Sequence, residues 1–288
     1  EQGVPTGFYF GGTFDGGNHS ISGINISNPA AGTGAYGLFG YVNGGTIANL
    51  NVSGSLDMGD SSTSAVGAVV GYTTGSLYNL HSSMTVSVND PTTNTASETG
   101  GIAGVVANTN SSPALYVRYC SNTGDVTGRG RMGGIVGAVY CLSDGGGVVD
   151  QCFNTGYIKS VFSTKKIFTG GIVGYCEGYI TNCYNQGNME TNNGHYLAGI
   201  VGILTGVPPV YPVASMSNCY STANFTGYAV GYDRWLWASA DFNPAVHITN
   251  CFYLATNSDM TQPNTDDSWG TQSHVSPVTV AELQGTAE

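Results

Sequence analysis

Gly133-Gly134-Ile135-Val136-Gly137 returns in related form at nearly regular intervals along the chain. Related copies stand at residues 37–40, 67–71, 100–104, 170–174, 198–202 and, in a weakened form, 228–231. Their closing glycines occupy positions 40, 71, 104, 137, 174, 202 and 231, so successive copies are 28 to 37 residues apart. A period of this length predicts a repeat architecture in which no unit is complete on its own.

A second motif keeps step with the first one. It reads Ile180-Thr181-Asn182-Cys183 in one copy, and related stretches occur at 47–50, 77–80, 117–120, 149–152, 216–219 and 248–251. The alternation of apolar and polar residues in these copies is typical of short β-strands, and the Gly and Asn residues between them indicate turns. Two independent markers that share one period make chance repetition a poor explanation.

The expected fold is all-β: a right-handed parallel β-helix, or solenoid, of about seven coils. A unit of about thirty residues cannot close its own core, so it must stack on its neighbours with parallel strands in contact along the axis. Residues 1–255 are expected to form this helix. Residues 256–288 lose the repeat and are expected to form a C-terminal extension or cap. A propeller is disfavoured because its blades need about forty residues or more.

Composition excludes several classes of function. Only 9% of the residues are charged, and 7 Lys and Arg against 18 Asp and Glu give a net charge of −11. A nucleic-acid-binding face needs clustered basic residues, so nucleic acid is not an expected partner. The same balance disfavours an anionic membrane surface. No stretch approaches eighteen consecutive apolar residues, so membrane insertion is not expected either.

The cysteines follow the repeat. Five of the seven occupy one position of the second motif, the position that Leu50 and Leu80 hold in the first two copies: Cys120, Cys152, Cys183, Cys219 and Cys251. Exchange with Leu indicates an inward apolar slot, so a column of buried free thiols is predicted. Disulfide or metal-binding roles are the alternative, but the odd count and the spacing favour neither.

No catalytic residue, metal site or cofactor is predicted. Carboxylates that neighbour one another in sequence do not recur at matching positions in adjacent coils, so turn roles are expected for Asp57, Asp60, Asp144, Asp150, Asp266 and Asp267. The histidines lack metal-binding spacing, so surface or turn roles are also expected for His19, His81, His195, His247 and His274.

One segment departs from the repeat, between the last glycine motif and the last cysteine motif. Tyr232, Trp235 and Trp237 lie there, and the two Trp residues would face the same side of a strand. Exposed, they are candidates for stacking on sugar rings. The reading we favour is that this segment caps the end of the coil stack, where strand edges would otherwise be unpaired.

At these motifs the chain resembles the GLUG-motif family of bacterial extracellular proteins. Gly37-Leu38-Phe39-Gly40 matches its Gly-Leu-x-Gly pattern directly, and the segment 12–21 is similar to the one that commonly precedes such arrays. The resemblance spans roughly residues 8 to 255. It implies a secreted or wall-anchored bacterial protein, because members of this family are typically of that kind. In some immunoglobulin A peptidases of the family, the repeats accompany a separate catalytic domain. It implies no catalytic residue, and the family's wall-anchoring signal is not found here.

Two functions therefore remain open. The first is an exported, non-catalytic cell-surface module, an adhesin or stalk that binds a host or microbial glycan or surface protein. The alternative is a carbohydrate-active β-helix enzyme, a polysaccharide lyase or glycoside hydrolase. Three or more acidic or basic side chains packed together on one exposed face would favour the enzyme. Ice binding is disfavoured because the outward Thr positions are not regular enough.

Overall fold

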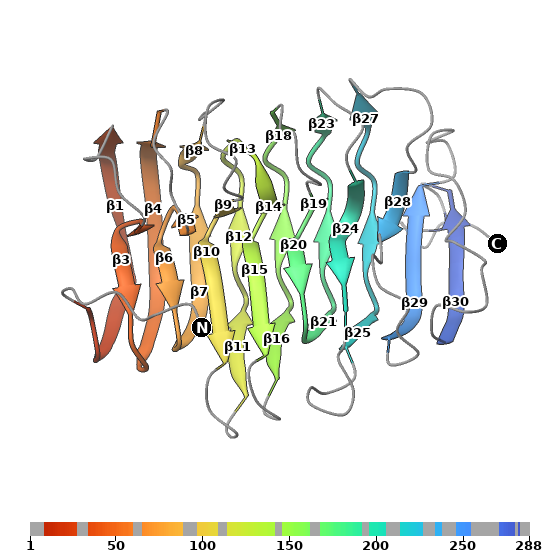
Figure 1. Cartoon of the computed structure of the whole chain (residues 1–288), viewed down its shortest axis with the longest axis horizontal. Helices are drawn as coiled ribbons and strands as arrows, with labels where there is room; N and C mark the ends of the chain where they lie inside the picture. The colour runs from red at the N-terminus through yellow and green to blue at the C-terminus, as the bar shows by residue number, and fades with distance from the viewer. Residues whose placement is uncertain are drawn as a thin grey trace.

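The computed structural model describes residues 9–27, 34–59, 65–88, 97–108, 114–141, 146–161, 168–191, 196–205, 214–226, 234–237, 246–254, 271–279 and 282. These residues form two long parallel sheets that wind around one core as a right-handed β-helix, which confirms the expected fold class. Successive coils follow one another from the N-terminal to the C-terminal end of the rod (Figure 1).

Among the described residues, the larger sheet, which we call sheet B, has eighteen strands. They are β1 (Thr13–Ser27), β4 (Thr46–Asp57), β7 (Ser76–Ser82), β8 (Thr85–Ser87), β11 (Leu115–Arg118), β12 (Ser121–Asn122), β13 (Val126–Gly128), β16 (Gly147–Asp150), β17 (Phe153–Asn154), β18 (Ile158–Ser160), β21 (Tyr179–Thr181), β22 (Tyr184–Asn185), β23 (Met189–Thr191), β25 (Ala214–Ser217), β26 (Tyr220–Ser221), β27 (Phe225–Thr226), β29 (Val246–Leu254) and β30 (Thr271–Val278).

The smaller sheet, sheet A, has twelve strands in the part of the chain that the structure describes. They are β2 (Ala35–Tyr36), β3 (Phe39–Val42), β5 (Ala65–Gly67), β6 (Val70–Thr73), β9 (Ser97–Gly100), β10 (Ala103–Asn108), β14 (Gly130–Gly133), β15 (Val136–Cys141), β19 (Phe168–Gly170), β20 (Val173–Cys176), β24 (Tyr196–Leu204) and β28 (Arg234–Trp237).

The seven predicted copies of the second motif are successive rungs of sheet B. Parallel pairing joins β4, β7, β11, β16, β21, β25 and β29 in that order. Strand β1 extends this ladder before the first copy, and β30 extends it after the last copy. The predicted boundary at residue 255 lies outside the described residues. Thr271–Val278 belongs to the expected C-terminal extension, and it pairs with β29 as a further rung of sheet B.

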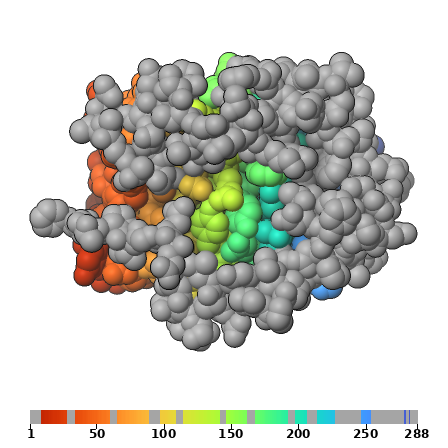
Figure 2. Space-filling view, in the orientation of Figure 1, coloured from red at the N-terminus to blue at the C-terminus, as the bar shows by residue number. Residues whose placement is uncertain are grey.

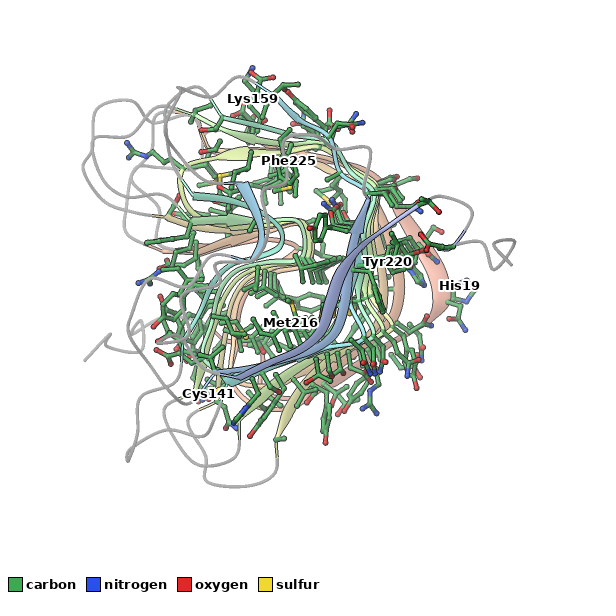
Figure 3. The ribbon with its side chains drawn as sticks, turned by 90° about the vertical axis from the view of Figure 1, so that its right-hand side faces the viewer. His19, Cys141, Lys159, Met216, Tyr220 and Phe225 are labelled. Carbon is green, nitrogen blue, oxygen red and sulfur yellow. The ribbon has the colours of Figure 1, made fainter. Side chains whose placement is uncertain are left out.

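Inward positions fill a continuous apolar core along the axis. Figure 3, which looks along the rod, shows Met216 and Phe225 pointing inward and His19 and Lys159 pointing outward. Met216 is fully buried and Phe225 is 5% exposed. The chain turns between strands at residues with left-handed backbone angles, such as Asn182 with φ 54°. Asn tolerates this conformation better than most residues, which explains its recurrence just before the inward Cys or Leu.

The first glycine motif bends sheet A. A Cβ on Gly133 would lie 2.0 Å from the backbone oxygen of Val136, and one on Gly137 would lie 2.5 Å from the backbone nitrogen of Thr99. Only glycine fits where backbones approach this closely. Each coil of sheet A thus has two arms, such as β14 and β15, whose outer faces turn toward each other. We call this bend the re-entrant corner.

Candidate functional site

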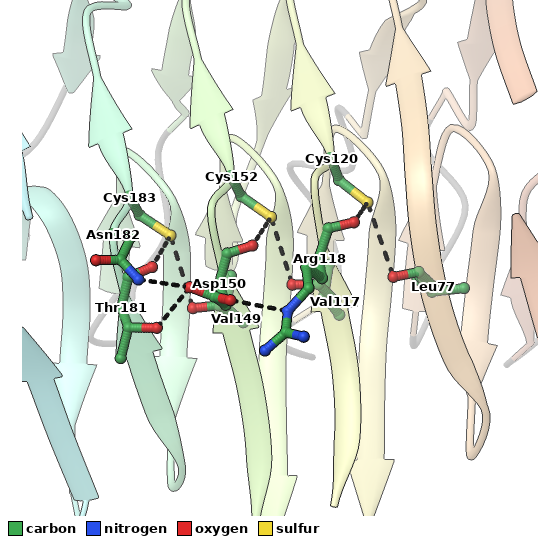
Figure 4. A network of polar contacts seen from close by, with 10 residues as sticks. All are labelled: Leu77, Val117, Arg118, Cys120, Val149, Asp150, Cys152, Thr181, Asn182 and Cys183. Atoms are coloured by element: carbon green, nitrogen blue, oxygen red, sulfur yellow. Dashed lines mark hydrogen bonds and ion pairs between the residues drawn. The ribbon is translucent and has the colours of Figure 1, made fainter. Parts of the chain in front are cut away.

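The cysteine column of sheet B has a structural role. All seven cysteines are free and buried, which confirms the predicted thiol column. Figure 4 shows three of these thiols donating to backbone oxygens, and the Sγ of Cys183 lies 3.1 Å from the oxygen of Thr181. Burial raises the pKa of the Cys152 thiol, so it stays protonated. Protonated thiols with no exposure are poor nucleophiles and metal ligands.

The expected turn role is wrong for Asp150, which is the last residue of strand β16 and is held by protein groups. Its Oδ2 lies 2.8 Å from Nε of Arg118, and its Oδ1 accepts hydrogen bonds of 2.8 Å from Thr181 and Asn182 (Figure 4). The residue is 4% exposed. Asp150 therefore joins three neighbouring rungs and has little room for a ligand.

Of the other acidic candidates, the structure describes Asp57 alone. Asp57 accepts a hydrogen bond from the backbone of Gly59 at 2.9 Å, which is the predicted turn role. Asp60, Asp144, Asp266 and Asp267 lie outside the described residues. Across the described part of the chain, no three His, Cys, Asp or Glu side chains are grouped to hold a metal ion. No described helix is long and apolar enough to cross a membrane.

The tryptophan segment is only partly described. Tyr232 lies outside the described residues, and only the backbone of Trp235 and Trp237 is placed, in β28. Strand β28 pairs in parallel with β24, with Trp235 opposite Ala198 and Trp237 opposite Val201. The segment thus adds a rung to sheet A after β24. Whether the three aromatic side chains cap the stack or bind a ligand stays a prediction.

A charged cluster that the sequence analysis missed lies at the re-entrant corner of sheet A. Arg131 on β14 lies one rung beyond Glu98 on β9, because these two residues are direct register partners. Nη1 of Arg131 is 3.2 Å from Oε1 of Glu98. The hydroxyl of Tyr140, on the facing arm β15, donates to the same Glu98 oxygen at 3.0 Å and accepts a hydrogen bond from Nη1 of Arg131.

A second carboxylate belongs to the same cluster. The Tyr175 hydroxyl donates to Oε1 of Glu177 at 2.6 Å, and Oε2 of Glu177 accepts the backbone N–H of Cys141 at 2.9 Å. The guanidinium carbon of Arg131 lies 4.2 Å from the centre of the Tyr175 ring and 5.5 Å from that of Tyr140. Arg131 therefore packs on tyrosines of two rungs, an arrangement stabilised by cation–π attraction.

Burial sets the protonation of this cluster. It raises the pKa of the Glu98 carboxyl, and Arg131 and Tyr140 oppose that change by stabilising the charged form. Burial also raises the pKa of the Tyr140 and Tyr175 hydroxyls, and the neighbouring carboxylates raise it further. Both phenols are therefore protonated donors at neutral pH and poor bases. A buried carboxylate with a raised pKa beside a specific charged partner is characteristic of functional sites.

Apolar residues on the two arms complete the corner. A small apolar cluster outside the main core comprises Ala65, Val105, Ala107 and Ala138, and Tyr72, Tyr140 and Tyr175 pack against it. Small residues at these outward positions leave the tyrosine rings partly exposed. The guanidinium-bearing side chain of Arg131 is 31% exposed. Sheet A faces the viewer in Figure 2, where residues of the middle repeats, yellow to blue-green, occupy the centre of the face.

At the re-entrant corner, aromatic rings and a guanidinium group are in contact with solvent. The two carboxylates beneath them are hydrogen bonded to protein groups. Glu98 is 7% exposed and Glu177 is 8% exposed. The accessible chemistry is therefore mainly that of Tyr140, Tyr175 and Arg131. This combination suits recognition of a ligand with both apolar faces and hydroxyl groups.

No model of a known protein family matches the sequence, and no curated protein matches it. Among solved structures, the fold is similar to the 1.30 Å crystal structure of a candidate immunoglobulin A1 protease from Bacteroides ovatus. The TM-score is 0.55 at 20% sequence identity, and the match covers 95% of this chain and 70% of the other. At this identity the likeness shows a shared β-helix fold.

Proposed function

We propose that this chain is an exported bacterial cell-surface module that binds glycan, without catalysis, at the re-entrant corner of sheet A. Two observations support a place at the bacterial cell surface. They are the sequence resemblance to GLUG-motif proteins and the fold shared with a Bacteroides protein named as a candidate immunoglobulin A1 protease. The rod presents the corner on successive rungs. An extended polymer is therefore the kind of ligand that it suits.

The observation that carries the proposal is the packing of Arg131 on Tyr140 and Tyr175. Sugar rings have apolar C–H faces that pack on aromatic rings and hydroxyl groups that bond to planar polar groups. The protein network fixes these side chains before any ligand arrives, which lowers the entropic cost of binding. Buried Glu98 contributes by orienting Arg131 and Tyr140, from which it accepts its hydrogen bonds.

A glycan-array screen of the purified chain, followed by titration of the strongest ligand, tests this proposal. Tyr175→Ala and Arg131→Gln should each weaken binding at least about tenfold, the scale of one lost anchor contact. Arg118→Gln is the matched control, because Arg118 also packs over a tyrosine, Tyr116, but lies on sheet B. Equal binding by all of these variants, or no glycan bound by the unmodified chain, would contradict the proposal.

The carbohydrate-active enzyme remains a second candidate, favoured by one specific observation. Glu98, Arg131 and Glu177 meet in one cluster. Three acidic or basic side chains packed together on one exposed face are the feature that would favour an enzyme, and the cluster has three. A carboxyl with a raised pKa, such as Glu98, is suited to act as a general acid. The cluster departs from the criterion in exposure, because both carboxylates are nearly buried and hydrogen bonded to the protein.

The two candidates differ in a direct assay. Incubation with the array ligand should leave its chain length unchanged if the module only binds. Shorter products that Glu98→Gln abolishes would establish the enzyme instead. Product sizes measured by mass spectrometry distinguish these results.

A further inference from the structure

A polar pocket of about 300 Å³ opens on the outer face of sheet B, away from the re-entrant corner. It spans the rungs of β1, β4, β7 and β12, and its lining includes Ser20, Asn51, His81, Ser121 and Thr123. The described lining residues carry hydroxyl, amide, imidazole and one valine side chain, with no carboxylate, ammonium or guanidinium group. An uncharged ligand rich in hydroxyl groups matches this lining.

Two lining side chains, His81 and the nearly buried Ser121, which is 4% exposed, form a relay with Asn79, which lies outside the lining. The Oγ of Ser121 lies 2.7 Å from Nδ1 of His81, and Nε2 of His81 lies 3.0 Å from Oδ1 of Asn79. The amide nitrogen of Asn79 donates to Oδ1 of Asn18 at 2.9 Å and to Oδ1 of Asn49 at 2.8 Å. Both amide hydrogens are thus engaged, and the carbonyl oxygen of Asn79 faces the imidazole.

This arrangement fixes the tautomer of His81. Because the facing oxygen of Asn79 can only accept, Nε2 carries the ring proton and donates it. Nδ1 then has a free lone pair, which accepts the hydroxyl proton of Ser121. Burial lowers the pKa of His81, which keeps the imidazole neutral and this lone pair available.

The fold itself places the three groups. Ser121 and His81 are direct register partners on β12 and β7. Asn79 stands at the left-handed turn position of the same coil, with φ 51°, two residues before His81. The asparagine column of sheet B, which otherwise serves the turns, here orients a histidine beside a serine.

We propose that Ser121 is a nucleophile, activated by His81 and oriented through Asn79, that acts on small O-acyl esters of neutral polyhydroxylated compounds. Oγ of Ser121 forms a bond to the acyl carbon while its proton moves to Nδ1 of His81. The carbon–oxygen bond to the alcohol breaks, and the departing oxygen takes that proton. Water then attacks the acyl-serine, giving its proton to His81, and the carboxylic acid leaves as Oγ regains a proton.

This activity is independent of glycan binding at sheet A and lies on the opposite sheet. The test uses a serine-directed fluorophosphonate probe, with the labelled peptide mapped by mass spectrometry, and hydrolysis of p-nitrophenyl acetate. The unmodified chain should be labelled at Ser121. Ser121→Ala should abolish that label, and both Ser121→Ala and His81→Gln should slow hydrolysis at least about a hundredfold, the scale of a lost nucleophile or general base.

Ser55→Ala is the control, because Ser55 lies on the same sheet, on β4, but outside the lining of the pocket. It should change hydrolysis less than about twofold, within the range of a substitution outside the relay. Thermal unfolding of each variant checks that it folds. Labelling at another serine, no labelling of the unmodified chain, or undiminished hydrolysis by folded Ser121→Ala would overturn the proposal.

Discussion

The inward and outward columns of this solenoid use their repeats differently. In sheet B, the inward column that contains the cysteines keeps an apolar side chain, either Leu or Cys, from rung to rung. At the re-entrant corner of sheet A the outward column changes at each rung, through Ala65, Glu98, Arg131 and Phe168. A repeated residue does the same packing task in every coil. A changing column brings different chemistry together in neighbouring coils, so it can form a site.

The largest expected effect is at the bend that separates the arms of sheet A. Gly133→Ala should lower the free energy of unfolding by at least about 3 kcal/mol, because the new Cβ would meet backbone oxygen. Gly12→Ala is the control, since its nearest contact would be the Phe10 ring at 3.5 Å. Urea unfolding measures both variants. Similar stability of the two would show that the bend does not depend on glycine.

The cysteine column should be next in effect. Cys183→Ala removes a fully packed thiol from the core and should cost about 1–2 kcal/mol through lost contacts and the small cavity left behind. Ellman's reagent should react with none of the five motif thiols until the chain unfolds. Fast reaction of the native protein would contradict a purely structural column, and so would an unchanged unfolding midpoint of the variant.

At the re-entrant corner, the contribution of Glu98 to the free energy of unfolding is expected to depend on pH. Burial raises the pKa of Glu98 in the folded state above its ordinary value of 4.5, so the folded chain holds this proton at pH values where the unfolded chain has lost it. The Glu98 contribution to stability is therefore fully present below about pH 4.5 and is lost as pH rises through the folded pKa.

Glu98→Gln removes this titration. Unfolding midpoints of the two proteins, measured from pH 4 to pH 8, should show the unmodified chain losing stability relative to the variant as pH rises. A difference that stays constant with pH, or one that changes in the opposite direction, would mean that the cluster favours ionised Glu98.

The smallest effect is expected at the asparagine turns. Asn218 has a φ of 54°, and Asn218→Ala should cost about 1 kcal/mol because alanine tolerates this conformation less well. Asn218→Gly should restore most of that loss, as glycine has no Cβ to strain. Thermal unfolding of the pair measures the difference. A glycine variant as unstable as the alanine variant would assign the effect to the lost bond with Asn182.

Sequence reasoning predicted the parts of the molecule that repeat. The period gave the parallel coils, and the exchange of Leu80 for Cys120 gave the buried column. Glu98 and Arg131 were missed because each is a single charge within its own coil. They stand two residues before Gly100 and Gly133, so aligning this outward position between coils would have paired them.

The partners on the facing arm could not be found in this way. Tyr140 and Glu177 approach the cluster only because sheet A bends outward on itself, and the repeat period carries no information on the direction of that bend. The relay at His81 was missed for a related reason. Ser121 and His81 are forty residues apart, and only the rung-to-rung register makes them neighbours.

A crystal structure of the chain with the strongest glycan-array ligand tests the central claim most directly. The account predicts a sugar ring against Tyr140 or Tyr175, with a hydroxyl group hydrogen bonded to Arg131. A ligand bound along sheet B, with the corner of sheet A left empty, would contradict it.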